Sequence, residues 1–124
     1  MHILFVDDIS ETRDLFRLCF TLQGHTAETA PNGMAALDII THNADALDVV
    51  IMDYHMPEMT GLEVVERLRQ RNDITQVPII LFTGDTMGEF ESQAQKLGVA
   101  RVVYKPILPA ALIAAAQEVV TKSH

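Results

Sequence analysis

The chain has 124 residues, of which 48% are hydrophobic, and its formal net charge is −8 with a sequence pI near 4.9. This length suits one domain of ordinary size and is too short for two. The acidic charge disfavours direct binding to nucleic acid or to an anionic membrane. No apolar run approaches the roughly 20 residues that span a bilayer, and the start of the chain has no basic segment or cleavage site of a secretory signal. The single cysteine, Cys19, excludes an intramolecular disulfide and fits a reducing compartment, so we expect a cytoplasmic protein.

Strand and helix signals alternate five times along the chain. The expected strands are short apolar or β-branched runs at 3–6, 25–29, 49–53, 77–82 and 102–104. The expected helices lie at about 11–23, 33–42, 61–71, 86–97 and 109–121. The run at 25–29 is the weakest strand signal, and we expect it at the outer edge of the sheet. Five βα units of this length predict one parallel sheet with helices on both faces, an α/β fold.

Residues at the ends of these helices support the predicted boundaries. Ser10 and Asn32 are expected N-caps of the first two helices. Gly24 and Gly98 follow the last turns of the first and fourth helices, where glycine commonly ends a helix. The segment 86–89 matches the capping-box pattern, and a proline at position 109 suits the first residue of the last helix.

The central strand 49–53 is apolar along its length and ends on a carboxylate, Asp53. An apolar run without alternation is typical of a strand buried on both faces of a parallel sheet. The following segment, 54–61, contains proline and glycine and is expected to be a loop. Because ligands bind outside the carboxyl ends of the strands in open α/β sheets, Asp53 is a candidate reactive group.

Other polar residues follow the neighbouring strands: Asp7 and Asp8, Thr83, and Lys105. Since parallel strands end at the same edge of a sheet, these side chains should converge on Asp53. Three carboxylates repel one another, and a divalent cation together with the lysine ammonium offsets that repulsion. Oxygen ligands without clustered cysteine or histidine indicate Mg²⁺ or Mn²⁺ and not zinc. A lysine and a threonine beside a metal suit a phosphoryl group. Each residue alone is commonly a helix cap or a turn residue; their joint placement favours a functional site.

With these motifs the chain resembles a response-regulator receiver domain of two-component signalling, in the CheY-like superfamily. The resemblance covers essentially the full length and rests on these residues: Asp7-Asp8, Asp53 with Met56-Pro57 and Gly61, Thr83-Gly84, and Lys105-Pro106. It implies a flavodoxin-like fold of five βα units with strand order 2-1-3-4-5. It also implies one receiver domain over residues 1–124, a monomer or weak dimer, with no output domain and no direct contact with nucleic acid or membrane.

The resemblance further implies that Asp53 accepts a phosphoryl group from a phosphohistidine on a sensor histidine kinase or a histidine phosphotransfer protein. In this interpretation Asp8, Asp53 and the backbone carbonyl of His55 bind Mg²⁺, with Mn²⁺ as an alternative, and Asp7 assists through water.

Thr83, Gly84 and Lys105 are implied to surround the phosphoryl oxygens and to respond to phosphorylation. The side chains of His55 and Asp85 flank the expected path of the water that hydrolyses the acyl phosphate. The alternative for these two residues is an ordinary loop position.

The chain departs from the family pattern in two places. Val102 stands where the family has an aromatic residue three positions before the lysine, and an aromatic residue is found instead at Tyr104, which we expect to be a packing or surface residue. The first helix is apolar over a wide arc. This arc indicates either a well-covered helix or a partner-docking edge at Leu18 and Leu22.

Three other functions are less consistent with the sequence. A phosphatase of the haloacid dehalogenase type has a second aspartate two residues after its nucleophile, and here that residue is His55. An FMN carrier needs a phosphate-binding loop after the first strand, where Asp7 and Asp8 repel a phosphate. A binding module that is never phosphorylated does not require the intact set of aspartate, threonine and lysine.

Overall fold

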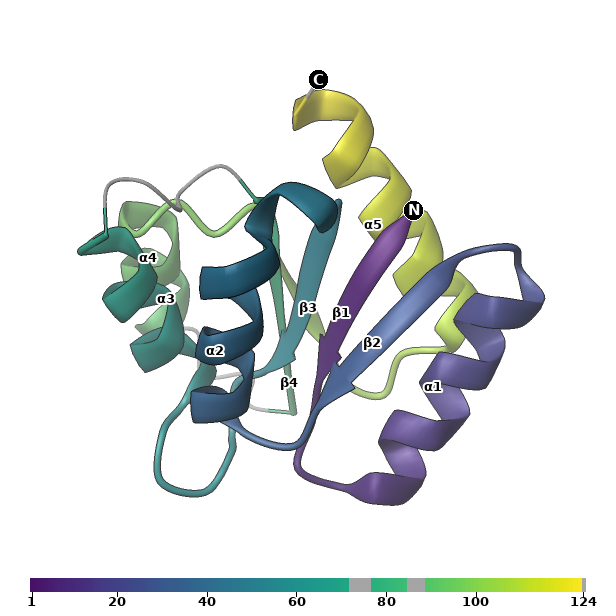
Figure 1. Ribbon diagram of the computed structural model, residues 1–124. Helices are drawn as coiled ribbons and strands as arrows, with labels where there is room; N and C mark the ends of the chain where they lie inside the picture. The colour runs from purple at the N-terminus through teal and green to yellow at the C-terminus, as the bar shows by residue number, and fades with distance from the viewer. Residues whose placement is uncertain (72–76, 85–88, 124) are drawn as a thin grey trace.

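The computed structural model describes residues 1–71, 77–84 and 89–123, and strands and helices alternate along them (Figure 1). The strands are β1 (His2–Val6), β2 (Thr26–Ala30), β3 (Val49–Asp53), β4 (Ile79–Thr83) and β5 (Arg101–Tyr104). The helices are α1 (Ser10–Leu22), α2 (Gly33–Asn43), α3 (Gly61–Arg69), α4 (Glu89–Lys96) and α5 (Pro109–Ser123). A short 3₁₀ helix, η1 (Ala44–Ala46), precedes β3. Among these described residues, no helix has the length and hydrophobicity needed to cross a bilayer.

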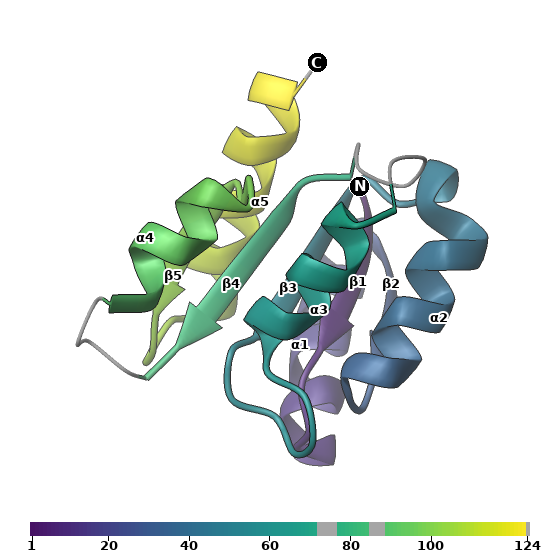
Figure 2. The same ribbon diagram turned by 90° about the vertical axis from the view of Figure 1, so that its left-hand side faces the viewer.

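All five strands are parallel and lie in the order β2-β1-β3-β4-β5, as predicted. Helices α1 and α5 cover one face of the sheet, and α2, α3 and α4 cover the other (Figures 1 and 2). The three inner strands are buried on both faces, which explains their continuous apolar sequences. β2 lies at an edge, as expected, and it alternates between exposed and more buried residues.

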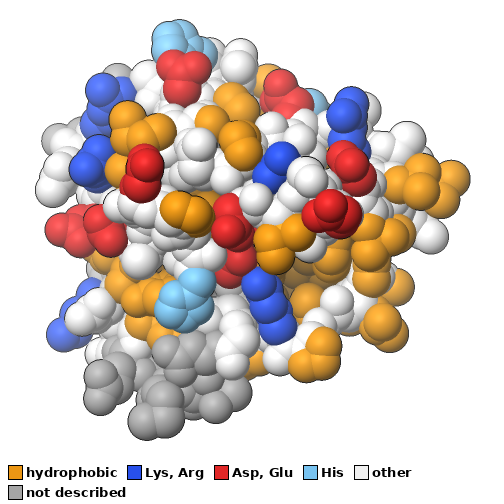
Figure 3. Space-filling view, turned by 90° about the horizontal axis from the view of Figure 1, so that it is seen from below, with side chains coloured by type: hydrophobic (Ala, Val, Ile, Leu, Met, Phe, Trp, Pro, Cys, Tyr) orange, Lys and Arg blue, Asp and Glu red, His pale blue; other side chains and the backbone are white. Residues whose placement is uncertain are grey.

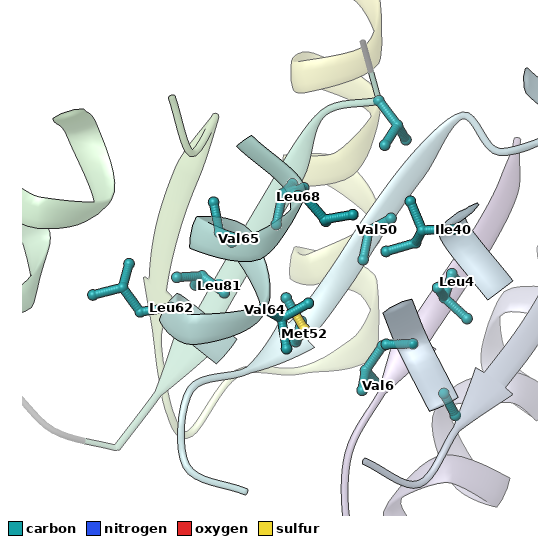
Figure 4. Close-up of a cluster of buried hydrophobic side chains, with 14 of the residues drawn as sticks. Leu4, Val6, Ile40, Val50, Met52, Leu62, Val64, Val65, Leu68 and Leu81 are labelled. Atoms are coloured by element: carbon teal, nitrogen blue, oxygen red, sulfur yellow. The ribbon is translucent and has the colours of Figure 1, made fainter. Parts of the chain in front are cut away.

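Successive residues of each strand point to opposite faces and fill two separate cores. Leu4 and Val50 face α2 and α3, in a cluster that includes Ile40, Val64 and Leu68 (Figure 4). The cluster on the opposite face contains the following residues of β1, α1 and β4: Ile3, Phe5, Phe16, Phe20, Ile80 and Phe82. The Phe5 ring stacks on Phe16 at 4.8 Å and on Phe82 at 5.5 Å between centroids. The inner strands therefore belong to both cores.

The start of α1 differs from the prediction that Ser10 caps it. Ile9 occupies the N-cap position without a side-chain cap, and the first helical bond runs from the Arg13 N–H to the Ile9 carbonyl at 3.1 Å. Ser10 is therefore the first helical residue. The Asp7 carboxylate accepts the Ile9 N–H at 2.8 Å, and this bond positions the helix start in place of a serine hydroxyl.

The other predicted caps were partly right. Asn32 Oδ1 accepts the Ala35 N–H at 2.8 Å, as predicted for an N-cap. Gly24 and Gly98 have φ of +88° and +77° and follow α1 and α4, also as predicted. A capping box formed by Thr60 and Glu63 starts α3, at a position where we predict only a loop from the sequence. The capping box predicted at 86–89 includes positions outside the described residues.

Where the described residues allow the comparison, several element ends differ from the predictions by one or two residues. β2 lies one residue later than the expected 25–29, and α3 ends at Arg69 instead of position 71. β4 starts at Ile79 and not at position 77, since Pro78 has no N–H to donate to the sheet and only its carbonyl bonds to the Val50 N–H. β5 begins one residue earlier than expected, and α5 extends to position 123 instead of 121.

Candidate functional site

The carboxyl ends of the strands bring the predicted polar residues together at one edge of the sheet. Asp7 and Asp8 follow β1, while Asp53 and Thr83 are the last residues of β3 and β4. One carboxylate oxygen from each of the three aspartates lies within 4.8 Å of the others. Figure 3 views this edge, where acidic and basic side chains meet near the middle of the face with hydrophobic side chains beside them.

Asp53 is buried, with 3% of its surface exposed, and it has two partners. Its Oδ1 accepts the His55 N–H at 3.2 Å, and its Oδ2 accepts a hydrogen bond from the Lys105 ammonium at 3.1 Å. Lys105 Nζ also lies 5.0 Å from the centroid of the Phe82 ring, a favourable position for a cation. The lysine therefore offsets the charge of the central carboxylate across the β3–β4–β5 edge.

Asp7 is fully buried and less well satisfied than Asp53. Its Oδ1 accepts the Ile9 N–H, but its Oδ2 is buried without a hydrogen-bond partner among the described residues. Burial raises the pKa of Asp7 above its ordinary value, and the charges of Asp53 and Asp8 raise it further, against the opposing effects of the Ile9 N–H and Lys105. A buried oxygen without a partner is costly, and a hydrated cation beside it removes that cost.

The donor set of this cluster fits a divalent cation such as Mg²⁺. Its groups are carboxylate oxygens, which this hard ion prefers, and the cluster contains no histidine or cysteine among the described residues. Asp8 is exposed and the other two aspartates are buried, so the cluster is open to solvent on one side.

Thr83 is fully buried at the end of β4, and the backbone joins it to the lysine on the next strand. Its carbonyl accepts the Lys105 N–H at 2.7 Å, and Tyr104 is its register partner in β5. Gly84, which was predicted to lie at the phosphoryl group, is exposed immediately after β4. Asp85, predicted to flank the hydrolytic water, lies outside the described residues.

The loop from Tyr54 to Thr60 is held tightly against the end of β3. The Gly61 N–H bonds to the Tyr54 carbonyl at 2.8 Å, and a Cβ at Gly61 would lie only 2.6 Å from the Asp53 carbonyl oxygen. Met56 and Met59 are buried in the core below the loop. Glycine at position 61 therefore permits α3 to begin directly against the backbone of Asp53. Spacing alone did not show this contact, although the Thr60-x-x-Glu63 pattern could have shown that a helix begins here.

The outer face of α1 is exposed, so the expectation of a well-covered helix is wrong for its leucines. Leu15, Leu18 and Leu22 are 53%, 55% and 74% exposed, while Phe16 and Phe20 on the other side are buried. On β5, Val102 and Tyr104 are partly buried and pack against the α2–α3–α4 core, so Tyr104 is a packing residue.

Comparisons with known proteins agree with this fold and show the family of the chain. The family model described as the response regulator receiver domain matches residues 3–117. A chemotaxis protein CheY homolog of Campylobacter jejuni is 36% identical over 113 residues, which are 90% of this chain and 86% of that protein. Among solved structures, a receiver domain from Clostridium thermocellum has a TM-score of 0.87 at 27% identity and covers 98% of this chain and 94% of its own. The chemotaxis response regulator CheY4 of Vibrio cholerae has a TM-score of 0.85 at 30% identity, covering 95% and 97%.

A doubly wound parallel sheet of order 2-1-3-4-5, with an acidic cluster and a lysine at its carboxyl edge, defines a flavodoxin-like domain of the receiver class. The chain belongs to the response-regulator receiver domains, of the CheY-like type, which act in two-component signalling. Receiver domains of this family bind Mg²⁺ at an acidic pocket, and this chain has an acidic cluster of Asp7, Asp8 and Asp53.

Proposed function

We propose that this domain takes a phosphoryl group from a phosphohistidine onto Asp53 and thereby carries a signal. The donor in this proposal is a sensor histidine kinase or a histidine phosphotransfer protein. The observation that carries the proposal is the pairing of the buried Asp53 carboxylate with Lys105, beside an Asp7 oxygen that has no partner among the described residues. The family membership supports the same function.

The reaction moves one phosphoryl group between two nucleophiles. A carboxylate oxygen of Asp53 attacks the phosphorus, the new P–O bond forms as the P–N bond to histidine breaks, and the bonding electron pair returns to the imidazole nitrogen. When Mg²⁺ is bound, it neutralises the phosphoryl oxygens. Lys105 transfers its hydrogen bond from Asp53 to a phosphoryl oxygen, because its flexible stem already places the ammonium at the site.

Each remaining site residue has a distinct role in this proposal. Asp8, Asp53 and the His55 carbonyl hold Mg²⁺, with Mn²⁺ as a substitute, and Asp7 assists through water. Thr83 and Gly84 face the phosphoryl oxygens at the end of β4. Water then hydrolyses the acyl phosphate, regenerating the Asp53 carboxylate and releasing phosphate, so the modification is temporary. The domain catalyses only its own phosphorylation and dephosphorylation.

Intact mass spectrometry after incubation with acetyl phosphate and Mg²⁺ tests the assignment of Asp53. We expect the wild-type chain to gain one phosphoryl group and Asp53→Asn to gain none. Asp38→Asn, at an exposed aspartate on α2 away from the cluster, is the matched control and should behave as wild type. Equal modification of Asp53→Asn and wild type overturns the proposal.

The partner-docking part of the proposal rests on the exposed leucines of α1. Leu15, Leu18 and Leu22 have the spacing i, i+3, i+7 and form one apolar stripe on the outer face of the helix that follows Asp8. A stripe of this spacing matches the apolar face of another helix. Helical phosphodonors therefore fit this surface better than a donor built of loops.

Comparing a protein donor with a small donor separates docking from chemistry. We expect Leu18→Ala and Leu22→Ala to slow phosphotransfer from a phosphorylated histidine phosphotransfer protein by roughly three- to tenfold each, because less apolar surface is buried in the complex. Phosphorylation by acetyl phosphate should be unchanged. Met34→Ala, at a residue on α2 that is 55% exposed, is the control. An equal effect on both donors, or no effect on either, contradicts docking at α1.

The proposal also concerns the whole chain. We propose one receiver domain over residues 1–124, since a single sheet joins all the described strands and the family match covers 3–117. The acidic net charge supports a monomer or weak dimer without direct nucleic-acid contact. The single cysteine supports a location in the cytoplasm.

A further inference from the structure

Three rings in contact join helix α4 to the loop that follows Asp53. The Tyr54 ring lies 4.7 Å from the Phe90 ring between centroids, at an interplanar angle of 39°. The other neighbour of Tyr54 is the His55 imidazole, at 4.7 Å and 82°, in an edge-to-face arrangement. Phe90, in the first turn of α4, is 6% exposed, Tyr54 is half-buried, and His55 is exposed. The chain of rings therefore runs from the core to the surface beside Asp53.

The backbone on both sides of the Tyr54 ring is fixed. The Tyr54 N–H bonds to the Phe82 carbonyl at 2.9 Å, and the Tyr54 carbonyl accepts the Gly61 N–H. The next N–H, of His55, bonds to the Asp53 carboxylate. One of the two ring neighbours of the tyrosine, Phe90, however, belongs to another element, α4. Its orientation consequently depends on where α4 places Phe90.

Helix α4 is held at its C-terminal end by α3, and at its other described end Phe90 is buried in the core. Arg69 Nε donates to the Leu97 carbonyl at 2.6 Å, and Arg69 Nη2 donates to the Gly98 carbonyl at 3.2 Å. In the described part of α4, the buried residues are Phe90 and Ala94. Of these two residues, Phe90 is the farther along the chain from the Arg69 bonds at Leu97 and Gly98.

From this geometry we propose that Tyr54 is a positioning residue that transmits the position of α4 to His55 and so sets the lifetime of phosphorylated Asp53. The inference rests on the proposed function, because it concerns the same acyl phosphate. With Phe90 in place, the tyrosine holds the imidazole at the mouth of the site, where it obstructs the approach of water. A partner that displaces α4 releases the imidazole and shortens the lifetime of the phosphorylated state.

The first test needs no phosphorylation. We expect Phe90→Leu, which keeps an apolar side chain but removes the ring, to shift the His55 ring resonances in an NMR spectrum toward those of free histidine, because Tyr54 loses its partner. Ala94→Gly loosens the same helix at its other buried residue without touching the rings, and it should leave His55 unchanged. Unchanged His55 resonances in Phe90→Leu, or equal shifts in both variants, overturn the proposal. Thermal melts confirm that each variant is folded.

The second test is a double-mutant cycle on hydrolysis of the acyl phosphate, followed after removal of the donor. Because an aromatic pair contributes a modest interaction, we expect Phe90→Leu and Tyr54→Leu to hydrolyse roughly two- to tenfold faster than wild type. In a His55→Ala background, Phe90→Leu should cause no further change. A purely structural role for Phe90 predicts the same acceleration with and without His55, and that outcome overturns the proposal. If the wild-type chain takes up no phosphoryl group, the proposed function is wrong. The His55 resonances in Phe90→Leu still show, independently of phosphorylation, whether Phe90 positions the imidazole through Tyr54.

Discussion

Asp7 and Asp53 are both buried carboxylates, but their surroundings differ. Asp53 has an N–H and an ammonium as partners, whereas Asp7 has one N–H and an oxygen without a partner among the described residues. The Lys105 ammonium donates a hydrogen bond to Asp53 and stabilises its ionised form. Asp7 has no such bond among the described residues, so folding disfavours the ionised form of Asp7. The raised pKa of Asp7 expresses this difference.

Replacing Asp7 by asparagine should stabilise the metal-free domain at neutral pH. The ordinary pKa is 3.8 and the folded value is higher, so between these values the folded chain binds more protons than the unfolded chain. The stability contributed by this group is therefore present below 3.8 and is lost as the pH rises through the folded pKa. We expect Asp7→Asn to have a higher Tm than wild type at neutral pH and no advantage below 3.8.

The same variant should respond less to Mg²⁺, because one of the carboxylates beside the ion is lost. Thermal melts with and without Mg²⁺ over a range of pH measure both effects. A Tm at neutral pH below that of wild type without metal contradicts the prediction.

Gly61 is a second residue whose identity is constrained by its surroundings, because the backbone of Asp53 lies too close for a side chain at this position. A methyl group there meets the Asp53 carbonyl oxygen at 2.6 Å and Leu81 at 3.0 Å, and the first contact is with backbone that cannot move aside cheaply. We expect Gly61→Ala to destabilise the domain by about 1–3 kcal/mol in urea unfolding and to slow phosphorylation by acetyl phosphate. Gly84→Ala, at an exposed glycine where a Cβ meets nothing within 4 Å, is the control for stability. Wild-type stability of Gly61→Ala contradicts this account.

The sequence predicted which polar residues converge at the carboxyl edge of the sheet, but not their contacts. The positions of Asp53, Thr83 and Lys105 were predictable because each follows a recognisable apolar strand and parallel strands end together. The pairing of Lys105 with Asp53, the Asp7 oxygen without a partner and the contact of Gly61 with the backbone depend on distances of a few ångströms. No spacing in the chain encodes those distances.

At the scale of elements, α1 and α2 begin in different ways. The amide of Ala35 is satisfied by the Asn32 side chain at the start of α2, whereas α1 begins at Ser10 after an N-cap, Ile9, that has no side-chain bond. The sequence favoured Ser10 because serine is among the best N-cap residues. It could not show that the Asp7 carboxylate already bonds the Ile9 N–H and shifts the helix start by one residue.

A pair of alanine substitutions tests this difference. We expect Asn32→Ala to lower the free energy of unfolding by about 0.5–2 kcal/mol, because the Ala35 N–H loses its acceptor. Ser10→Ala should change it by less than about 0.5 kcal/mol, since serine makes no cap there. Urea unfolding of both variants gives the comparison. A loss for Ser10→Ala as large as that for Asn32→Ala shows that the hydroxyl caps α1 after all.

At the scale of the molecule, the fold was predictable because the signals at each level agree. Continuous apolar strands, helices of suitable length and glycines after the helices all indicate the same parallel sheet. The sequence did not determine how much of α1 is covered. The leucines and phenylalanines of α1 together form its wide apolar arc, but α5 packs only on the side that carries Phe16 and Phe20. Leu15, Leu18 and Leu22 are left exposed.

The two cores share the inner strands, and this predicts that the domain unfolds as one unit. Leu68 lies in the core beneath α2 and α3, and Leu112 lies in the core beneath α1 and α5; both are fully buried. Adjacent residues of β1 point into opposite cores, so neither core can come apart while the other keeps its strands. We expect Leu68→Ala and Leu112→Ala each to destabilise the whole domain by about 2–5 kcal/mol. In each variant, the loss of helical circular dichroism and the change in tyrosine fluorescence should coincide in a single urea transition. Transitions that separate in either variant show that the two layers unfold independently, and one cooperative domain over residues 1–124 is then the wrong description.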